Sequence, residues 1–345
     1  MKNLLFLAKG CPNKIKSGGD IRALKMLQIL REQYEIDVVA RSADYGDSYI
    51  KAIGCRSHLV KDMKSEIKVI VENQKPEVII ISHWTLAEEM LDFIKSLSSS
   101  KIIIDSIDLE FLRLERKMQF GTIDKKQVEF IKNRELAIYK KANSIIMASD
   151  IDEIELQKYG SFSTILLPCL FDINYNYKTN EGRNSYIVCN WSHEPNVYST
   201  LFICKEIIPK LNSVFYIVGK HPPKDIVDFA SEKIIVCGAE YEIDKFLMKM
   251  NVLFCPVFYG AGSNFKIGQS LAFGIPVVTS EFGAKPYGLK YLEHCMIAEN
   301  KNDFIKCANE IFDNKDLRSK LSVNGKELIK NFTLEAYKEK FLANI

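Results

Sequence analysis

Short apolar runs rich in isoleucine and valine recur along almost the whole chain, and they limit its fold more than any other feature. The runs are continuous instead of alternating with polar residues, which is typical of strands buried on both faces of a parallel sheet. Helical patterns separate them, so the chain is predicted to be built from βαβ units. We expect strands at residues 4–8, 36–40, 57–60, 78–82, 102–105, 145–148 and 165–167, and then at 186–190, 214–219, 234–237, 252–256, 276–279 and 296–298.

The length of 345 residues predicts two domains of this α/β class. Residues 171–184, rich in Asn, Tyr and charge, read as a linker between residues 1–170 and residues 185–330. The amphipathic segment 331–345 is expected to form a terminal helix that packs on either domain. Doubly wound sheets bind ligands at the carboxyl ends of their strands, so we expect the site in a cleft between the two domains.

Composition excludes several classes of protein. Hydrophobic residues make up 47% and charged residues 26%, which argues against disorder, and a formal net charge of +3 without a basic tail argues against a dedicated nucleic-acid binder. The nine cysteines are scattered without a Cys-x-x-Cys motif, which favours a reducing cytoplasm. The apolar stretch near residue 1 is too short for a signal peptide, and no stretch long enough to span a membrane is found.

A glycine-bearing loop follows the first predicted strand. Ser17, Gly18 and Gly19 precede a helix that begins near Asp20. Adjacent glycines at a helix start let backbone amides approach an anion, and the helix dipole adds positive potential there. The loop therefore indicates a phosphate site, although it matches neither the dinucleotide fingerprint nor a P-loop. A flexible loop before an ordinary helix is the alternative.

Acidic residues follow the strand at 102–105. Asp105 and Asp108 are expected to reach a hydroxylated ligand from the carboxyl end of the sheet, with Arg113 and Arg116 on the next helix. His83, after the preceding strand, is a further polar candidate. The alternative is that Asp108 caps the helix and the other charges form a solvated ladder.

Residues 254–279 are the most informative part of the chain. After a strand, Gly260 and Gly262 form a turn, Ser263 or Asn264 is expected to cap a helix, and Gly274 is expected to end it before the next strand. Lys266 in the first helical turn adds a positive charge where a phosphate would bind, and Gln269 lies one turn further on the same face. Glycines, cap and charge together favour a phosphate site over a plain turn and helix.

This block resembles the donor-binding block of retaining GT-B glycosyltransferases, family 4 (glycosyl transferases group 1) in particular. Further stretches follow in the order that the family shows, and the likeness covers nearly the whole chain. They are Ser17-Gly18-Gly19, the segment from Asp105 to Arg116, Pro195-Asn196, the segment 217–220 and Gly238. The resemblance implies two Rossmann-like domains that bind a nucleotide-diphospho-sugar between them, with a terminal helix that crosses back to the first domain.

By position, the resemblance implies three catalytic residues: Lys266, Asp108 and Asp20. It also implies a set of donor-binding residues, which are Gly18, Gly19, Gly262, Ser263, Asn264, Phe265, Lys266, Gln269, Asn190 and His193. No cofactor is expected, because a fixed lysine and helix amides can stabilise the leaving diphosphate. Asp150 and Asp152 match the Asp-x-Asp of metal-dependent sugar transferases, but acidic residues in a first helical turn explain them better.

The fit departs from the family at two places. Gln269 stands where a glutamate usually binds the ribose, and Ala261 occupies the position of the second glutamate. The basic loop that the family usually has early in the second domain is replaced by residues 190–196. Glutamine can still bond a ribose diol, so donor binding is expected to survive better than specificity.

The leading hypothesis is therefore a cytoplasmic, retaining, metal-independent glycosyltransferase that acts on a glycan, lipid-linked or protein acceptor. A non-catalytic nucleotide-sugar-binding partner and a nucleotide-sugar epimerase of the same fold are the alternatives. Acceptor recognition is expected on loops 44–49 and 118–126. The basic helix over residues 125–141 raises peripheral contact with the inner face of the membrane as an alternative to a solvated surface. The sequence leaves the sugar, the base and the oligomeric state open.

Overall fold

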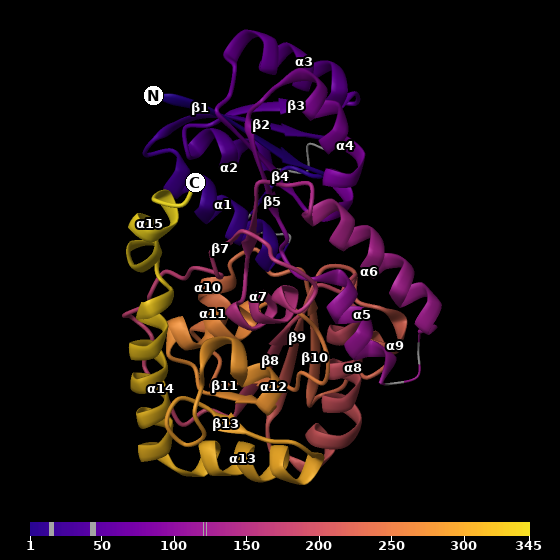
Figure 1. Cartoon of the computed structure of the whole chain (residues 1–345). Helices are drawn as coiled ribbons and strands as arrows, with labels where there is room; N and C mark the ends of the chain where they lie inside the picture. The colour runs from indigo at the N-terminus through magenta and orange to yellow at the C-terminus, as the bar shows by residue number, and fades with distance from the viewer. Residues whose placement is uncertain (14–16, 42–45, 120, 122) are drawn as a thin grey trace. The chain divides into compact units, whose positions relative to one another are not determined.

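A computed structural model describes residues 1–13, 17–41, 46–119, 121 and 123–345. The chain forms two compact units (Figure 1). Unit 1 comprises Met1–Leu170 and Leu334–Ile345, and unit 2 comprises Phe171–Thr333. Each unit is a parallel sheet with helices on its two faces.

Unit 1 has a seven-stranded parallel sheet in the order β3-β2-β1-β4-β5-β6-β7. Its strands are β1 (Lys2–Ala8), β2 (Tyr34–Ala40), β3 (Arg56–Leu59), β4 (Val78–Ser82), β5 (Lys101–Asp105), β6 (Ser144–Met147) and β7 (Thr164–Leu166). Its helices are α1 (Gly18–Leu30), α2 (Gly46–Ala52), α3 (Met63–Gln74), α4 (Trp84–Leu97), α5 (Glu110–Met118), α6 (Lys125–Tyr139), α7 (Asp150–Gln157) and α15 (Leu334–Leu342).

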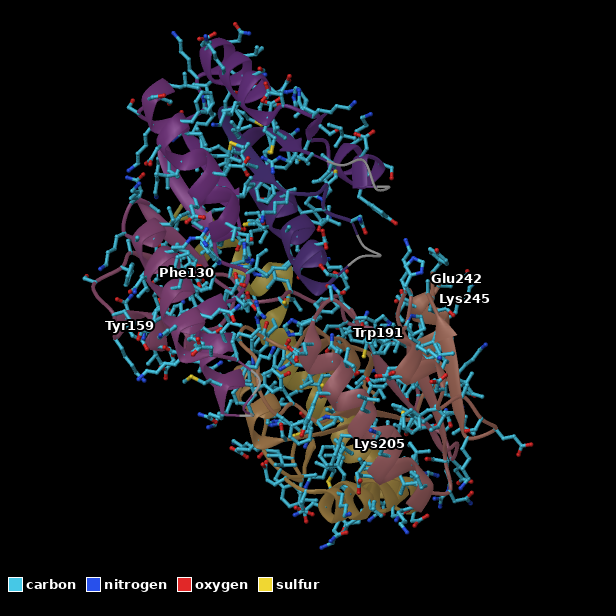
Figure 2. All side chains as sticks on the ribbon, turned by 90° about the vertical axis from the view of Figure 1, so that its right-hand side faces the viewer. Phe130, Tyr159, Trp191, Lys205, Glu242 and Lys245 are labelled. Atoms are coloured by element: carbon cyan, nitrogen blue, oxygen red, sulfur yellow. The ribbon has the colours of Figure 1, made fainter. Side chains whose placement is uncertain are left out.

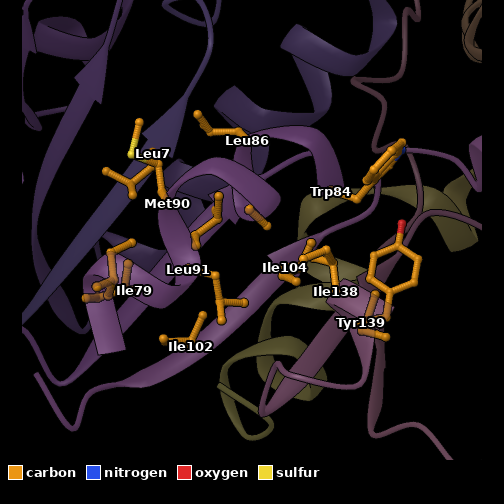
Figure 3. Close-up of a cluster of buried hydrophobic side chains, with 14 of the residues drawn as sticks. Leu7, Ile79, Trp84, Leu86, Met90, Leu91, Ile102, Ile104, Ile138 and Tyr139 are labelled. Carbon is orange, nitrogen blue, oxygen red and sulfur yellow. The ribbon is translucent and has the colours of Figure 1, made fainter. Parts of the chain in front are cut away.

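Two hydrophobic clusters cover the two faces of this sheet. Leu5 and Leu7 of β1 belong to one cluster, whereas Leu4 and Phe6 belong to the other. Figure 3 shows part of the first cluster, in which side chains of α4 pack on those of β4 and β5. Burial on both faces explains why the strands have continuous apolar sequences.

Helix α15 completes the second of these clusters. It contacts α1, and its Phe341 is 1% exposed within the cluster that also contains Leu27. Lys338 pairs with Glu32 at 2.6 Å beside this contact. Residues from both ends of the chain therefore share one core.

Unit 2 has a six-stranded parallel sheet in the order β10-β9-β8-β11-β12-β13. Its strands are β8 (Asn184–Val188), β9 (Val214–Val218), β10 (Ile234–Gly238), β11 (Val252–Cys255), β12 (Val277–Thr279) and β13 (Met296–Ile297). Its α-helices are α8 (Glu194–Phe202), α9 (Lys224–Val227), α10 (Ile243–Leu247), α11 (Phe265–Phe273), α12 (Glu281–Ala284), α13 (Lys301–Asp313) and α14 (Lys315–Ile329). A π-helical turn η1 (Ile203–Ile207) and short 3-10 turns η2 (Ile208–Lys210), η3 (Lys285–Tyr287) and η4 (Lys330–Phe332) complete it.

Residues 171–183 contain no helix or strand and pack within unit 2. The Tyr177 hydroxyl donates to the carbonyl oxygen of Met250 at 2.8 Å. The backbone amide of Asn174 donates to the carbonyl oxygen of Ala272 at 2.9 Å. One side-chain and one backbone hydrogen bond thus hold this segment within unit 2, although its composition suggested a linker.

The predicted α/β fold is confirmed strand by strand. Each of the thirteen apolar runs forms a strand, with ends displaced by at most two residues. All nine cysteines are free thiols, and Cys237 is the exposed one. Among the described residues, no helix has the length and apolar character needed to cross a bilayer.

Candidate functional site

The strand order of unit 2 reverses direction between the neighbouring strands β8 and β11. Helix α8 leads from β8 to β9 on one side, whereas α11 leads from β11 to β12 on the other. The connections diverge, so the carboxyl ends of β8 and β11 lie at a topological switch point, where open α/β sheets bind ligands. The loops that follow these two strands, residues 189–193 and 256–264, contain Asn190, His193 and the predicted turn from Gly262 to Asn264.

Helix α11 begins with open backbone amides at this switch point. Gly260 and Gly262 adopt φ of 158° and 69°, which glycine allows at low cost. Asn264, one of the two residues predicted to cap the helix, occupies the N-cap position, but its side chain makes no capping hydrogen bond. Within the described residues, the amides of Phe265 and Lys266 have no acceptor. Gly274 ends the helix in the left-handed conformation, as predicted.

Lys266 connects the two loops. Its Nζ donates to Oδ1 of Asn196 at 2.5 Å, and Nδ2 of Asn196 donates to the carbonyl oxygen of Asn190 at 2.8 Å. The structure therefore brings Lys266, Asn190 and His193 together around Asn196, a residue that sequence reasoning did not assign to the site. A signal was present, because Asn196 lies in the first turn of the helix after β8 and its amide can accept from a lysine.

The positive charge of Lys266 reaches the ends of both strands. Burial raises the pKa of Cys255, the last residue of β11, to about 11, and the charge of Lys266 partly offsets this rise. Burial likewise raises the pKa of Cys189, just after β8, against the same opposing charge. Gln269, one turn after Lys266 on α11, is half-buried and carries no charge.

The loop after β8 packs tightly on the loop after β9. A Cβ atom at Gly219 would lie 2.5 Å from the carbonyl oxygen of Cys189 and 2.6 Å from Nε1 of Trp191, so only glycine fits there. Trp191 is labelled in Figure 2. The carbonyl of Asn190 accepts from the amide of His193 at 3.2 Å, and His193 is the N-cap of α8. This packing holds the loop rigidly beside Lys266.

Unit 1 has a second switch point, between β1 and β4. Ser17 is the N-cap of α1 and accepts from the amide of Asp20 at 3.1 Å, while its hydroxyl donates to the Asp20 carboxylate. Asp20 therefore stabilises the start of α1. A Cβ atom at Gly19 would lie 3.4 Å from Ile107, so the start of α1, which includes Gly18, is next to the loop before α5. Residues 14–16 of the predicted glycine loop, and residues 44, 45, 120 and 122 of the predicted acceptor loops, are outside the described residues.

Asp105 and Asp108 have different environments. Asp105 is 1% exposed and pairs with Arg22 at 2.5 Å, so it does not reach toward a ligand as the sequence suggested. Asp108 is partly exposed and accepts from Nε of Arg113 at 3.2 Å. Leu109, not Asp108, is the N-cap of α5, which excludes the capping alternative. Arg116 contacts Asp152 at 3.5 Å.

His83 lies at the carboxyl end of β4 with φ of 77°, a conformation that is strained for a residue with a side chain. Its backbone amide donates to the carbonyl of Asp105 at 2.8 Å, and its Nδ1 lies 2.8 Å from the Thr85 hydroxyl. Burial lowers the pKa of His83, and the carboxylates of Asp108 and Glu110 oppose this shift. The imidazole is therefore neutral at pH 7.

Glu135 on α6 binds the start of α5, and no sequence pattern indicated this role. Its side chain is fully buried on α6 and accepts from the amides of Glu110 and Phe111 at 3.1 and 2.8 Å. The Tyr139 hydroxyl donates to it at 2.8 Å. Glu135 thus caps α5 from a neighbouring helix.

The Asp150-Ile-Asp152 segment forms the first turn of α7, with Ser149 as its N-cap. This agrees with the interpretation that acidic residues there favour the helix dipole. Throughout the ranges that the structure describes, no group of three or more His, Cys, Asp or Glu side chains is placed to hold a metal ion.

One model of a known protein family matches part of unit 2. Residues 185–314 match the family model described as Glycosyl transferases group 1. Unit 2 resembles group 1 glycosyltransferases. No match was found among curated proteins.

Solved structures extend the likeness to the whole chain. Sucrose-phosphate synthase from Thermosynechococcus elongatus is 15% identical, covers 99% of this chain and 98% of its own, and superposes with a TM-score of 0.79. HepE from Anabaena, in complex with UDP-glucose, is 10% identical with 99% of each chain covered and a TM-score of 0.79. A TarM mutant from S. aureus, in complex with fondaparinux, α-GlcNAc-glycerol and UDP, is 10% identical, covers 100% and 99%, and gives a TM-score of 0.77.

At these identities the likeness shows the fold, which is the predicted GT-B fold of two Rossmann-like domains. The predicted site residues form two groups. Gly18, Gly19, Asp20 and Asp108 are in unit 1, and Asn190, His193, Gly262, Ser263, Asn264, Phe265, Lys266 and Gln269 are in unit 2. Their roles stay predictions.

Proposed function

We propose that this protein is a glycosyltransferase that moves a sugar from a nucleotide-diphospho-sugar to a glycan, lipid-linked or protein acceptor. The observation that carries the proposal is the placement of Lys266 beside the open start of α11, at the switch point of unit 2. A lysine charge and unbonded helix amides are the groups that hold a diphosphate. The family match of residues 185–314 and the UDP bound in the HepE and TarM structures support the same ligand class.

The chemistry follows from charge. In the transfer step the bond between the anomeric carbon and the diphosphate oxygen breaks, and the negative charge grows on the leaving diphosphate. Lys266 and the amides of Phe265 and Lys266 stabilise that charge, so we expect no requirement for a metal ion or another cofactor. Retention of anomeric configuration follows from the resemblance to family 4. The acceptor hydroxyl oxygen bonds to the anomeric carbon on the face that the phosphate leaves, and its proton passes to the departing diphosphate oxygen.

Roles in unit 1 belong to the same proposal. Asp108, and neutral His83 beside it, supply an acceptor and a ring N–H donor for sugar or acceptor hydroxyls. Asp20 acts by fixing the start of α1, where Gly18 and Gly19 let a ligand approach the backbone. The setting we propose is the cytoplasm, with peripheral contact at the inner face of the membrane.

The test is ligand-dependent thermal stabilisation across a panel of nucleotide sugars, followed by assay of nucleoside diphosphate release. A ligand at 100 times its Kd stabilises the folded state by about 2.7 kcal/mol, which raises the melting temperature measurably. Lys266→Met should weaken donor binding by about 10- to 100-fold, because a charge-assisted hydrogen bond is worth about 1.5–3 kcal/mol.

Lys245→Met is the matched control, since Lys245 is an exposed lysine of α10 that pairs with Glu242 (Figure 2). It should leave binding unchanged. Sugar transfer by Lys266→Met at the rate of the unmodified protein refutes the proposed role. Tight donor binding without any turnover would favour the alternative that the protein is a non-catalytic nucleotide-sugar-binding partner. That alternative is suggested by Gln269, which stands in place of an acid.

A further inference from the structure

Every polar atom of Asn196 has a partner. Its side chain accepts from Lys266 and donates to the Asn190 carbonyl. Its backbone amide donates to the carbonyl of His193 at 2.9 Å, and its backbone carbonyl accepts from the Thr200 hydroxyl at 2.8 Å. Because Asn196 is fixed in the first turn of α8, the amine of Lys266 is held by a rigid group.

The partner of Lys266 is the neutral amide of Asn196. Lys245, Lys301 and Lys330 each pair with a glutamate. Among the described side chains, no carboxylate lies within 4 Å of the Lys266 amine. The sequence has no Asp or Glu from residue 252 to residue 280, nor from 184 to 193. Within the described part of the chain, no paired carboxylate therefore offsets Lys266 at its half-buried position.

We propose that Asn196 is a positioning and specificity-determining residue, which orients Lys266 without neutralising it and so selects ligands that carry a diphosphate. This inference rests on the proposed function and names the residue that sets its charge requirement. An aspartate of the same shape would form an ion pair with Lys266, and the site would then offer a diphosphate no net positive charge. An alanine would release the amine and leave its charge in place.

The experiment compares Asn196→Asp and Asn196→Ala in the full chain. Binding of UDP, inorganic pyrophosphate and uridine is measured by calorimetry, and the melting temperature is measured without ligand. Asn184→Asp is the control, because Asn184 lies at the amino end of β8, whereas the site follows its carboxyl end, and its side chain donates to the Lys249 carbonyl. That variant adds the same charge away from the site.

Asn196→Asp should weaken UDP and pyrophosphate binding by about 30- to 100-fold, since one unit charge is removed from the site at close range. Uridine binding should not change. The melting temperature should change little, because the new ion pair with Lys266 offsets the lost hydrogen bond to the Asn190 carbonyl. Asn196→Ala should weaken the binding of UDP and pyrophosphate by about three- to tenfold, because the Lys266 amine is no longer oriented. A residue with only a structural role would instead lower the melting temperature and the binding of all three ligands together.

Failure of the two proposals can be separated. If Asn196→Asp binds the two anions as well as the unmodified protein does, the role of Asn196 is overturned and the proposed function stands. The same conclusion follows if Asn184→Asp loses as much anion binding as Asn196→Asp. If pyrophosphate binds and UDP binds no better, the nucleotide-sugar proposal falls, while the pyrophosphate measurements still decide the role of Asn196. If neither anion binds the unmodified protein, both proposals fall.

Discussion

Replacing Asp105 by asparagine should strongly destabilise unit 1, although the two side chains have almost the same shape. Asp105 and Arg22 are each 1% exposed at the side chain, and Nη1 and Oδ1 lie 2.5 Å apart. Nε of Arg22 also donates to the carbonyl of Leu167 at 2.8 Å, which fixes the guanidinium between β5 and β7. Removing one partner of a buried ion pair leaves an uncompensated charge and costs about 3–5 kcal/mol. We expect about 3 kcal/mol for Asp105→Asn.

Asp108→Asn is the matched comparison. Asp108 and Arg113 have side chains that are 17% and 24% exposed, and they lie 3.2 Å apart. A pair that is open to solvent contributes about 0–1 kcal/mol, so this variant should stay close to the unmodified protein in stability. The two substitutions remove the same charge three positions apart, and burial alone separates their expected effects.

Urea unfolding followed by tryptophan fluorescence measures the difference. The chain has two tryptophans, Trp84 in unit 1 and Trp191 in unit 2, so a Trp191→Phe background lets Trp84 report on unit 1 alone. A decrease of less than about 1 kcal/mol in the free energy of unfolding for Asp105→Asn would refute the reasoning. It would mean that the Arg22 guanidinium is solvated by water in the variant. The double variant Arg22→Met with Asp105→Leu should recover most of the lost stability, since no buried charge then lacks a partner.

Two further predictions concern stability. Burial raises the pKa of Glu135 from 4.5 in the unfolded chain to about 8 in the folded one, so the unfolded chain loses its proton first as the pH rises. The free energy of unfolding of unit 1 should therefore fall between pH 4.5 and 8, by about 5 kcal/mol. A pH series of urea titrations should show that Glu135→Gln lacks this slope, while Glu129→Gln on the exposed face of α6 keeps it. Gly268→Ala would place its Cβ 2.2 Å from the ring of buried Phe171, and overpacking costs about 1–3 kcal/mol. Thermal unfolding of unit 2 should show a lowered melting temperature, and an unchanged one would mean that Phe171 can move aside.

The strands could be predicted because their signal is local. Burial on both faces of a parallel sheet requires apolar residues at consecutive positions, and the segment Val78–Ser82 shows this so clearly that even its ends were placed correctly. The end of α11 at Gly274 was predictable for a similar reason, since a left-handed terminal residue favours glycine.

The side-chain partners could not be predicted because they depend on contacts between distant segments. Asp105 looked like a ligand-binding acid until Arg22, 83 positions away, was found beside it. Asn196 and Lys266 are 70 positions apart and meet only because β8 and β11 are neighbours in the sheet. Glu135 lies on a helix whose pattern indicates surface charge, yet it is fully buried. For Asp105 and Asn196 the strand order, which the sequence leaves open, decides the partner, whereas for Glu135 the packing of α6 against α5 decides it.

The location of α15 has a consequence for the order in which the protein folds during synthesis. The first 170 residues leave the ribosome long before Leu334–Ile345, yet both belong to unit 1. Until α15 is made, the surface of α1 that receives Phe341 is exposed, and a nascent unit 1 presents an apolar patch while unit 2 is still being translated. Unit 2 can therefore close its core first, and the N-terminal unit, although synthesised earlier, is the last to be completed.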